Sequence, residues 1–204
     1  MRKKEMKPGN MLYPVPAALI SARGKDGRTG LLTAAWCGTV CSDPPMLSVS
    51  IKKSRFTHHL IEESREFTVN LTTEEMVRAV DLCGVISGKD VDKWEKSGLH
   101  EEEGLKVSAP SVQESPVSIE CKVTQILELG SHDMFLGEVV SVRAAEEFFD
   151  ETGRFDLDKA RLMAYSHGEY RALGKVLGTF GFSVRKNTKN ETSKAGKKPE
   201  RKRK

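Results

Sequence analysis

A cluster of cationic and hydroxyl side chains follows a short alternating segment, SVSIKKSRFTHHL, at residues 48–60. The cluster consists of Ser50, Lys53, Ser54, Arg55 and Thr57. It falls where the polar face of a predicted strand meets the start of a predicted helix, and backbone N–H groups, hydroxyls and fixed positive charges together bind phosphate well. The pattern therefore predicts a site for a phosphorylated ligand. A solvated basic turn with an ordinary helix cap explains the same local sequence.

The segments around this cluster are typical of strands. AALISARG (17–24) and LLTAAWCGTVCS (31–42) flank the pair Asp26-Gly27, a strong hairpin signal, and we expect them to pair antiparallel. VSIECKVTQILEL (117–129) and MFLGEVVSVRAAE (134–146) flank a turn and predict a second hairpin. Two further segments alternate apolar and polar residues, PMLSVSIKK (45–53) and EFTVNL (66–71). The inward side chains are expected to be Leu47, Val49, Ile51, Phe67, Val69, Leu71, Val117, Ile119, Cys121 and Val123.

Three short segments predict helices. SRFTHHLIEES (54–64) has Ser54 or Thr57 available as the N-cap, and its neighbours His58 and His59 are expected at the surface. Adjacent helical residues diverge by ~100°, so these two histidines are not expected to bind one metal ion together. TTEEMVRAVDLCG (72–84) opens with a capping-box pattern and should end at its glycine. DVDKWEKSG (90–98) should pack its valine and tryptophan and also end at its glycine.

The balance of many strands and few short helices predicts a mainly β fold, a closed or half-closed antiparallel barrel. At 204 residues, 38% hydrophobic and 30% charged, the chain has the length of one substantial domain or two small ones. No run approaches the ~18 apolar residues that span a bilayer, and Pro14 and Pro16 interrupt the segment after the basic N-terminus. We therefore expect a cytoplasmic protein.

The C-terminal tail differs in composition from the rest of the chain. Residues 186–204 hold nine Lys or Arg against two Glu, whereas the other 185 residues carry 24 basic and 27 acidic groups. The tail has no large apolar residue and is expected to be disordered. It is interpreted as a solubility tail or as a segment with weak, nonspecific attraction to nucleic acid. The four cysteines have no zinc spacing and are expected to be buried thiols, although a Cys37–Cys41 pair is conceivable.

The run LLTAAWCGTVCSDPPMLSVSIKKSRFTHHLIEESREFTVNL (31–71) resembles the flavin reductase-like, FMN-binding split-barrel family, which includes flavoredoxins and reductase components of two-component monooxygenases. Three further matches follow in order, CGVISGKDVDKW (83–94), SHDMFLGEVV (131–140) and MAYSHGEYRALG (163–174). The resemblance implies an antiparallel, Greek-key split barrel. The expected organisation is a basic extension at 1–10, an FMN-binding domain at 11–185 and a disordered tail at 186–204.

The resemblance also implies a set of site residues. The strand along the isoalloxazine ring would be formed by Thr33, Ala34, Ala35 and Trp36, where small side chains permit close approach of the ring. The alternative interpretation of this segment is a core strand with incidental small residues. Facing the ribityl chain and binding the phosphate would be Ser48, Ser50, Lys53, Ser54, Arg55 and Thr57. At the edge of the pocket would lie Ser87, Gly88, Asp92 and Lys93, for which a turn and a capped helix are the alternative.

His132 matches a histidine that the family often places near the open face of the flavin, where nicotinamide must stack, and it is the candidate catalytic residue. A lone histidine in a turn is also often structural or merely exposed. Tyr165, His167 and Tyr170 line the pocket or serve in packing. The family is typically homodimeric, so the resemblance implies a homodimer with the flavin near the subunit interface.

Two hypotheses about function remain open at this point. In the first, the chain binds FMN, takes a hydride from NADH or NADPH at flavin N5 and passes electrons to free flavin or a protein acceptor. The sequence has no Gly-x-Gly-x-x-Gly motif, which fits a nicotinamide that merely stacks on the flavin and has no domain of its own. In the second, the chain is a flavoredoxin-like electron carrier, or an FMN store or sensor, without an NAD(P)H site. Nucleic-acid binding through the tail is a weaker third idea.

Overall fold

The computed structural model describes residues 1–185, and the predicted basic tail at 186–204 lies outside the described residues. The chain divides into two compact units, residues 1–173 and 174–204. In its described part the second unit contains one short 3₁₀ helix, η4 (Phe182–Val184). Within residues 1–185, no helix is long and apolar enough to cross a membrane.

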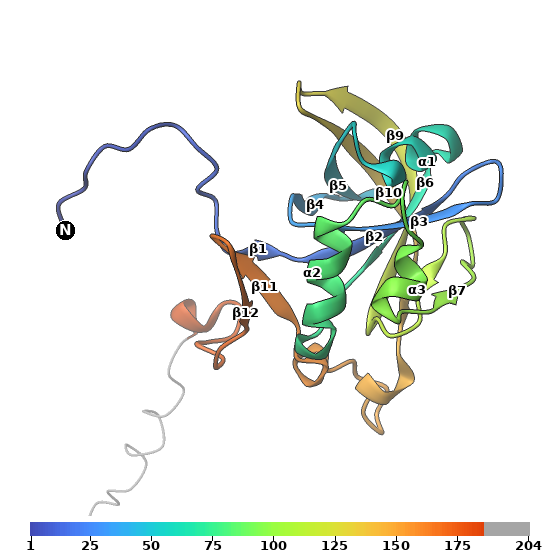
Figure 1. Cartoon of the computed structure of the whole chain (residues 1–204). Coiled ribbons are helices and arrows are strands. Elements are labelled where there is room, and N and C mark those ends of the chain that lie inside the picture. The colour runs from blue at the N-terminus through green and yellow to red at the C-terminus, as the bar shows by residue number, and fades with distance from the viewer. Residues whose placement is uncertain (186–204) are drawn as a thin grey trace, which may run out of the picture. The chain divides into compact units, whose positions relative to one another are not determined.

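The first unit is built on one curled antiparallel sheet of seven strands (Figure 1). Across the sheet the order is β3-β2-β6-β9-β10-β5-β4, so β3 and β4 form its two edges and, in the described chain, do not pair with each other. The strands are β2 (Ala18–Arg23), β3 (Thr29–Ala34), β4 (Cys37–Ser42), β5 (Pro45–Lys52), β6 (Glu66–Asn70), β9 (Val117–Glu128) and β10 (His132–Ala144). The mainly β prediction and the two antiparallel hairpins, β2–β3 and β9–β10, are confirmed.

Two smaller sheets complete the strands of this unit. One joins β1 (Val15–Pro16), β11 (Met163–Ser166) and β12 (Glu169–Ala172), and the other pairs β7 (Glu101–Glu102) with β8 (Ser111–Val112). In the first of these sheets the rings of Tyr13, Tyr165, His167 and Tyr170 lie against one another in edge contacts. Packing of these aromatic side chains is therefore what the structure supports for this segment.

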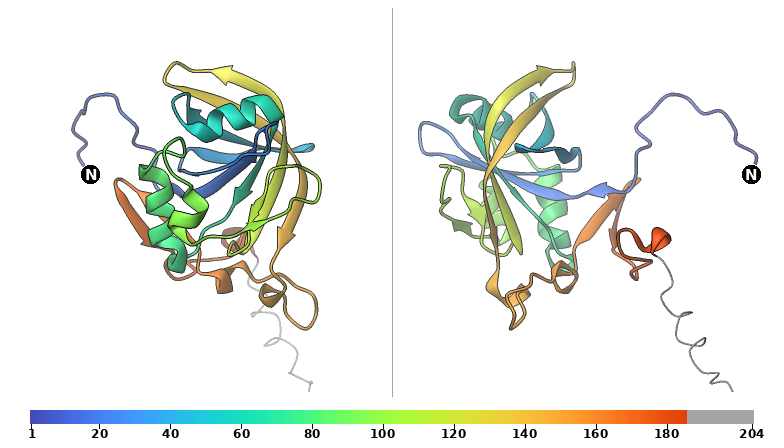
Figure 2. Two further views of the ribbon diagram at one scale, coloured as in Figure 1. Left: turned by 45° about the vertical axis from the view of Figure 1, so that its right-hand side comes forward. Right: turned by 180° about the vertical axis from the view of Figure 1, so that it is seen from behind.

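The helices are few and short, as predicted. They are α1 (Phe56–Ser64), α2 (Val77–Val85) and α3 (Lys93–Ser97), with 3₁₀ turns η1 (Glu74–Met76), η2 (Glu146–Phe148) and η3 (Leu157–Ala160). In Figure 2, α1 lies at one end of the curled sheet, where it packs on one face of the hairpin β2–β3. Helices α2 and α3 cover the other face of this hairpin. Gly30 on β3 allows the close approach of α1, because a Cβ atom there would lie 2.7 Å from Leu60.

Two apolar clusters form the core, one on each face of β2. Ile20, Phe67 and Phe135 belong to the cluster inside the curl of the sheet, whereas Leu19 and Val80 belong to the cluster beneath α2 and α3. All of these side chains are fully buried. Because β2 is covered on both faces, it reads as a continuous buried strand rather than an alternating one. The predicted inward face of β5 is buried as expected, at Leu47, Val49 and Ile51.

The structure corrects the predicted boundaries of one strand segment and one helix segment. The stretch 31–42 is not one strand: β3 ends at Ala34, and the chain then crosses the curl so that β4 pairs with β5. The helix predicted at 72–84 has no capping box, because the Thr72 hydroxyl donates to the carbonyl of Ala17 instead. It starts as η1, becomes α2 and runs through Gly84 to Val85. Tertiary contacts override the local capping signal here.

Two predictions for α1 are also wrong. The N-cap is Arg55, without a side-chain cap hydrogen bond, and Thr57 lies inside the helix and is buried. His58 was expected at the surface but is only 3% exposed. It faces β10, where its ring meets Phe135 at a centroid distance of 5.1 Å. The third helix is as predicted, with Asp92 as a true N-cap and Gly98 at its end.

The four cysteines are free thiols. Cys83 and Cys121 are buried, in agreement with the prediction from the sequence, whereas Cys37 and Cys41 on β4 are only partly buried. Burial raises the pKa of Cys37 to about 11, so this thiol stays protonated at neutral pH.

Candidate functional site

A hollow of about 240 Å³ opens where the end of β3, the end of β5 and the start of β10 meet. It collects residues that are far apart in the sequence but adjacent in the curled sheet. The predicted site residues that line it are Thr33, Ala34, Ala35, Trp36, Ser50, Arg55 and His132. The hollow therefore joins the small-residue strand, one end of the basic cluster and the candidate catalytic histidine.

The small-residue wall of the hollow belongs to an edge strand. Within the described residues β3 pairs only with β2, so the outer backbone N–H groups of its last residues have no strand partner. The hydroxyl of Thr33 donates to the carbonyl of Val80 and ties this strand to α2. Because Ala34 and Ala35 have only methyl side chains, a planar ligand can approach the backbone closely at this edge.

Trp36 and His132 form the opposite rim. The Trp36 carbonyl accepts a hydrogen bond from the Ser50 N–H at 2.8 Å, which fixes the tryptophan beside β5. Its ring lies 4.5 Å from the ring of His132 between centroids, at an interplanar angle of 45°. Trp36 is 41% exposed. An exposed indole beside a polar rim is typical of a ligand-binding surface.

Lys52 also lines the hollow, although it is not among the site residues predicted from the sequence. In the strand ladder Lys52 is the direct partner of His132, so the two side chains project from the same face of the sheet. Partial burial and the neighbouring Lys52 ammonium lower the pKa of His132. The alternation that places Ser48 and Ser50 on one face of β5 extends to Lys52, and this signal was present in the sequence.

Lys53, which the sequence analysis favoured, makes other contacts. Its ammonium lies 2.8 Å from a carboxylate oxygen of Glu128 and 3.3 Å from one of Asp133. It does not line the hollow. The remaining hydroxyl residues of the predicted phosphate patch differ in exposure: Ser54 is exposed, while Thr57 is buried next to Gly30.

Arg55 and Lys93 converge on the C-terminal end of α2. The Arg55 guanidinium donates to the Gly84 carbonyl at 2.7 Å, and the Lys93 ammonium donates to the Cys83 carbonyl at 2.7 Å. Cations at a helix C-terminus stabilise the helix dipole. Lys93 is 4% exposed. Its burial, with a further contribution from the charge of Arg55, lowers its pKa to about 8.

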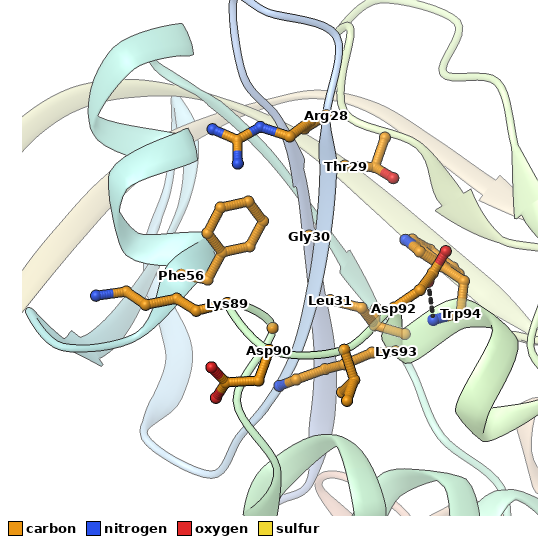
Figure 3. A pocket seen from close by; sticks show the side chains of 12 residues that line it. Arg28, Thr29, Gly30, Leu31, Phe56, Lys89, Asp90, Asp92, Lys93 and Trp94 are labelled. Carbon is orange, nitrogen blue, oxygen red and sulfur yellow. Dashed lines mark hydrogen bonds between the residues drawn. The ribbon is translucent and has the colours of Figure 1, made fainter.

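A second hollow, of about 390 Å³, lies beside Phe56 and is shown in Figure 3. Gly88, Asp92 and Lys93, three of the predicted pocket-edge residues, line it together with Arg28 and Phe56. Asp92 accepts a hydrogen bond from the Trp94 N–H at 2.8 Å and so caps α3, as Figure 3 shows. The fourth predicted edge residue, Ser87, accepts a hydrogen bond from the N–H of Lys89 at 3.2 Å.

A third, more apolar hollow, of about 770 Å³, lies on the other side of Trp36. Ser48, Cys37 and Val40 line it together with residues 9–13 of the N-terminal segment. Ser50 and Trp36 border both this hollow and the first one. The tryptophan therefore stands between the two hollows.

Comparison with known proteins identifies the family to which this chain belongs. The profile of the flavin reductase like domain matches residues 10–174, which is most of the chain. The chain belongs to the flavin reductase-like family. This match includes the four motifs that carry the resemblance in the sequence and the three elements that meet at the first hollow.

Solved structures of flavin reductase-like proteins have the same fold. Flavoredoxin of Desulfovibrio vulgaris (Miyazaki F) is 32% identical, with a TM-score of 0.83 over 90% of this chain and 100% of that one. Flavoredoxin from Methanosarcina acetivorans is 30% identical, with a TM-score of 0.81 over 91% and 100%. The FMN-binding protein from Thermus thermophilus is 28% identical, with a TM-score of 0.70 over 84% and 94%. The predicted split-barrel fold is thereby confirmed, with a sheet whose edges do not close.

Proposed function

We propose that the chain is an FMN-binding, NAD(P)H-dependent flavin reductase that passes electrons on to free flavin or to a protein acceptor. Family membership supports a flavin oxidoreductase. The observation that carries the proposal is the first hollow, in which an edge strand of small residues faces Lys52, Arg55 and the pair Trp36–His132. These groups suit a ligand with a planar ring at one end and a phosphate at the other.

The donor set of the hollow fits FMN. Backbone N–H groups without strand partners at the end of β3 can donate to the carbonyl and nitrogen edge of an isoalloxazine ring. Ser50 offers a hydroxyl in the hollow for the ribityl chain, Ser48 offers a second one from the adjoining hollow along β5, and Arg55 offers a cation for the phosphate. Of the phosphate-binding residues proposed from the sequence, Lys53, Ser54, Arg55 and Thr57, only Arg55 lines the hollow, and Lys52 joins it there.

Bound flavin supplies the redox chemistry, since its ring accepts a hydride from nicotinamide and hands the electrons on. The residues of the chain bind and orient. Partial burial and the Lys52 ammonium lower the pKa of His132, which favours its neutral form near pH 7, and the imidazole can position a nicotinamide by contact and hydrogen bonding. Trp36 covers one side of the hollow and limits the access of water. Arg55 and Lys93 add positive charge at the end of the hollow proposed for the phosphate.

The proposal is tested by a visible absorption spectrum of the purified protein, followed by anaerobic addition of NADH and then NADPH. A yellow protein whose flavin band is bleached within seconds by either donor is the expected result. Free FMN mixed with the same donors in the absence of protein is the control. A colourless protein that takes up no added FMN would overturn the proposal.

A flavoredoxin-like electron carrier or FMN-binding sensor is the second candidate, because two flavoredoxins are among the similar solved structures. A carrier needs the same FMN site but no nicotinamide site. A flavin band that is bleached by dithionite but not by NADH or NADPH would support this candidate against the first.

We also propose that the functional form is a cytoplasmic homodimer. The apolar hollow beside Trp36 carries exposed Met11, Leu12 and Val40, a grouping that is costly to leave in water. Light scattering coupled to size exclusion gives the mass in solution and tests the assembly. A mass of one chain at micromolar concentration would contradict it.

A further inference from the structure

A buried histidine on α1 lacks a partner for one of its ring nitrogens. Nε2 of His58 lies 2.8 Å from Oδ2 of Asp133, and both side chains are nearly fully buried. Nδ1 of the same ring is buried and, within residues 1–185, has no hydrogen-bond partner. Leaving such a group unsatisfied is unfavourable for folding. A buried ring nitrogen of this kind is a candidate ligand for a metal ion.

Two further ligand groups stand on the same helix. Nδ1 of His59 and Oε2 of Glu62 are 3.9 Å apart, and both side chains are about half-exposed. One ligand atom from each of His58, His59 and Glu62 can be chosen so that all three lie within 4.8 Å of one another. The sequence predicted that the two histidines diverge too far to share an ion. In the structure the two rings nevertheless lie close together, with centroids 5.4 Å apart.

The surroundings of His58 resemble those of a metal-ligating histidine. In metal sites the second ring nitrogen usually donates to a carboxylate, which fixes the tautomer and raises the basicity of the ligating nitrogen. Asp133 is in position to accept that proton from Nε2, which leaves the lone pair on Nδ1. The ammonium of Lys53, 3.3 Å from the other oxygen of Asp133, compensates the buried carboxylate.

We propose that His58, His59 and Glu62 bind one divalent transition-metal ion of the zinc type. Two imidazoles and one carboxylate are a ligand set that suits Zn²⁺ and leaves a fourth position for water. In an assembled tetrahedral site the ligand atoms lie ~3.3 Å apart, given metal–ligand bonds of ~2.0 Å. Closing on the ion from the present separations requires the exposed side chains of His59 and Glu62 to move inward, while Asp133 holds His58 in place.

The proposed ion site is distinct from the flavin hollow. His132 and Asp133 are consecutive on β10, so their side chains project to opposite faces of the sheet. His132 lines the hollow and Asp133 holds His58 beneath α1. An ion held there would link α1 to β10 through His58 and would stabilise the fold without taking part in electron transfer. The proposal does not depend on the proposed function.

The test is isothermal titration of the full chain, free of any affinity tag, with ZnCl₂. We expect one ion per chain, and in the variants His59→Ala and Glu62→Gln a loss of affinity of about tenfold or more. Both side chains are exposed, so neither variant is expected to unfold, which circular dichroism verifies. His100→Ala is the matched control, since His100 and Glu114 form another exposed histidine–carboxylate pair at 2.6 Å; it should bind zinc as the wild type does.

A second measurement reads the ligand geometry directly. Co²⁺ bound in place of Zn²⁺ should give the intense visible bands of a four-coordinate nitrogen and oxygen site, and these bands should be absent in His59→Ala. No stoichiometric zinc binding by the wild type, or equal affinity in the wild type and both variants, would overturn the proposal.

Discussion

The imidazole of His132 lies against the indole of Trp36, with ring centroids 4.5 Å apart, at the rim of a hollow that small residues line on the other side. The two residues come from segments nearly a hundred positions apart, and only the curl of the sheet brings them together. On the proposed function this rim is where a nicotinamide meets the flavin. His132 should therefore matter for the donor more than for the cofactor.

For His132→Ala we expect slower reduction of bound flavin by NAD(P)H with little change in FMN affinity. The physical reason is the loss of a positioned contact to the donor, which costs reaction rate but not cofactor binding. Anaerobic stopped-flow absorbance gives the rate, and fluorescence titration gives the FMN dissociation constant. His100→Ala serves as a control for removal of an exposed histidine elsewhere. The reverse pattern, intact rate with weakened FMN, would assign His132 to the cofactor shell.

For Arg55→Ala we expect FMN affinity to fall by about tenfold to about 150-fold, since a charge-assisted contact contributes about 1.5–3 kcal/mol. The guanidinium also donates to the Gly84 carbonyl at the end of α2, so a modest loss of stability should accompany the change. Thermal unfolding of the apoprotein separates the two effects. Lys122→Ala, which removes an exposed cation from β9, is the control. Unchanged affinity in a folded Arg55→Ala variant would refute the phosphate assignment.

For Lys52→Ala we expect the pKa of His132 to rise. In the wild type, partial burial lowers this pKa first and the Lys52 ammonium lowers it further, so removal of the cation relieves part of the repulsion that opposes protonation. In the variant the imidazole of His132 therefore becomes neutral only at a higher pH than in the wild type. Titration of the imidazole carbon-bound protons by NMR measures both values, with Lys53→Ala as the comparison. A pKa of His132 that is the same in the wild type and Lys52→Ala would show that the contact is not electrostatically significant.

Alternation within β5 and the Asp26-Gly27 hairpin could be recognised from the sequence because these signals are local. The same holds for the N-cap at Asp92, where the carboxylate and the amide it binds are two residues apart. The edge strand, the histidine and one arginine of the candidate site were found through the ordered motifs of a family. Each of these features depends on residues that are close together in the sequence or on a recognisable sequence motif.

What could not be predicted depends on contacts between distant segments. Thr72 looked like a helix cap, yet its hydroxyl binds the carbonyl of Ala17, which no local pattern reveals. The alternation of β5 places Lys52 on the face of Ser48 and Ser50, but the partners of Lys52 and Lys53, which are His132 and Asp133, come from the distant strand β10. The burial of His58 likewise requires β10 beneath the helix. In each case the partner lies more than fifty residues away.

Lys93 provides a prediction that does not involve ligands. Its burial lowers its pKa from 10.5 to about 8, so between these two values the unfolded chain binds more protons than the folded chain. The stability contributed by this residue must then rise with pH across that window and be lowest below about pH 8, where a charged ammonium is held in the interior. Lys93→Met removes this dependence.

We therefore expect the unfolding free energy of the wild type, measured relative to that of Lys93→Met, to increase from about pH 7.5 to about pH 10. Urea denaturation of both proteins at several pH values gives this difference, in which the titration of all other groups cancels to first order. Lys96→Met, which changes an exposed lysine of the same helix, should leave the difference from the wild type independent of pH. If the difference in unfolding free energy between the wild type and Lys93→Met did not change with pH, the Lys93 ammonium would be fully solvated, contrary to its burial in the structure.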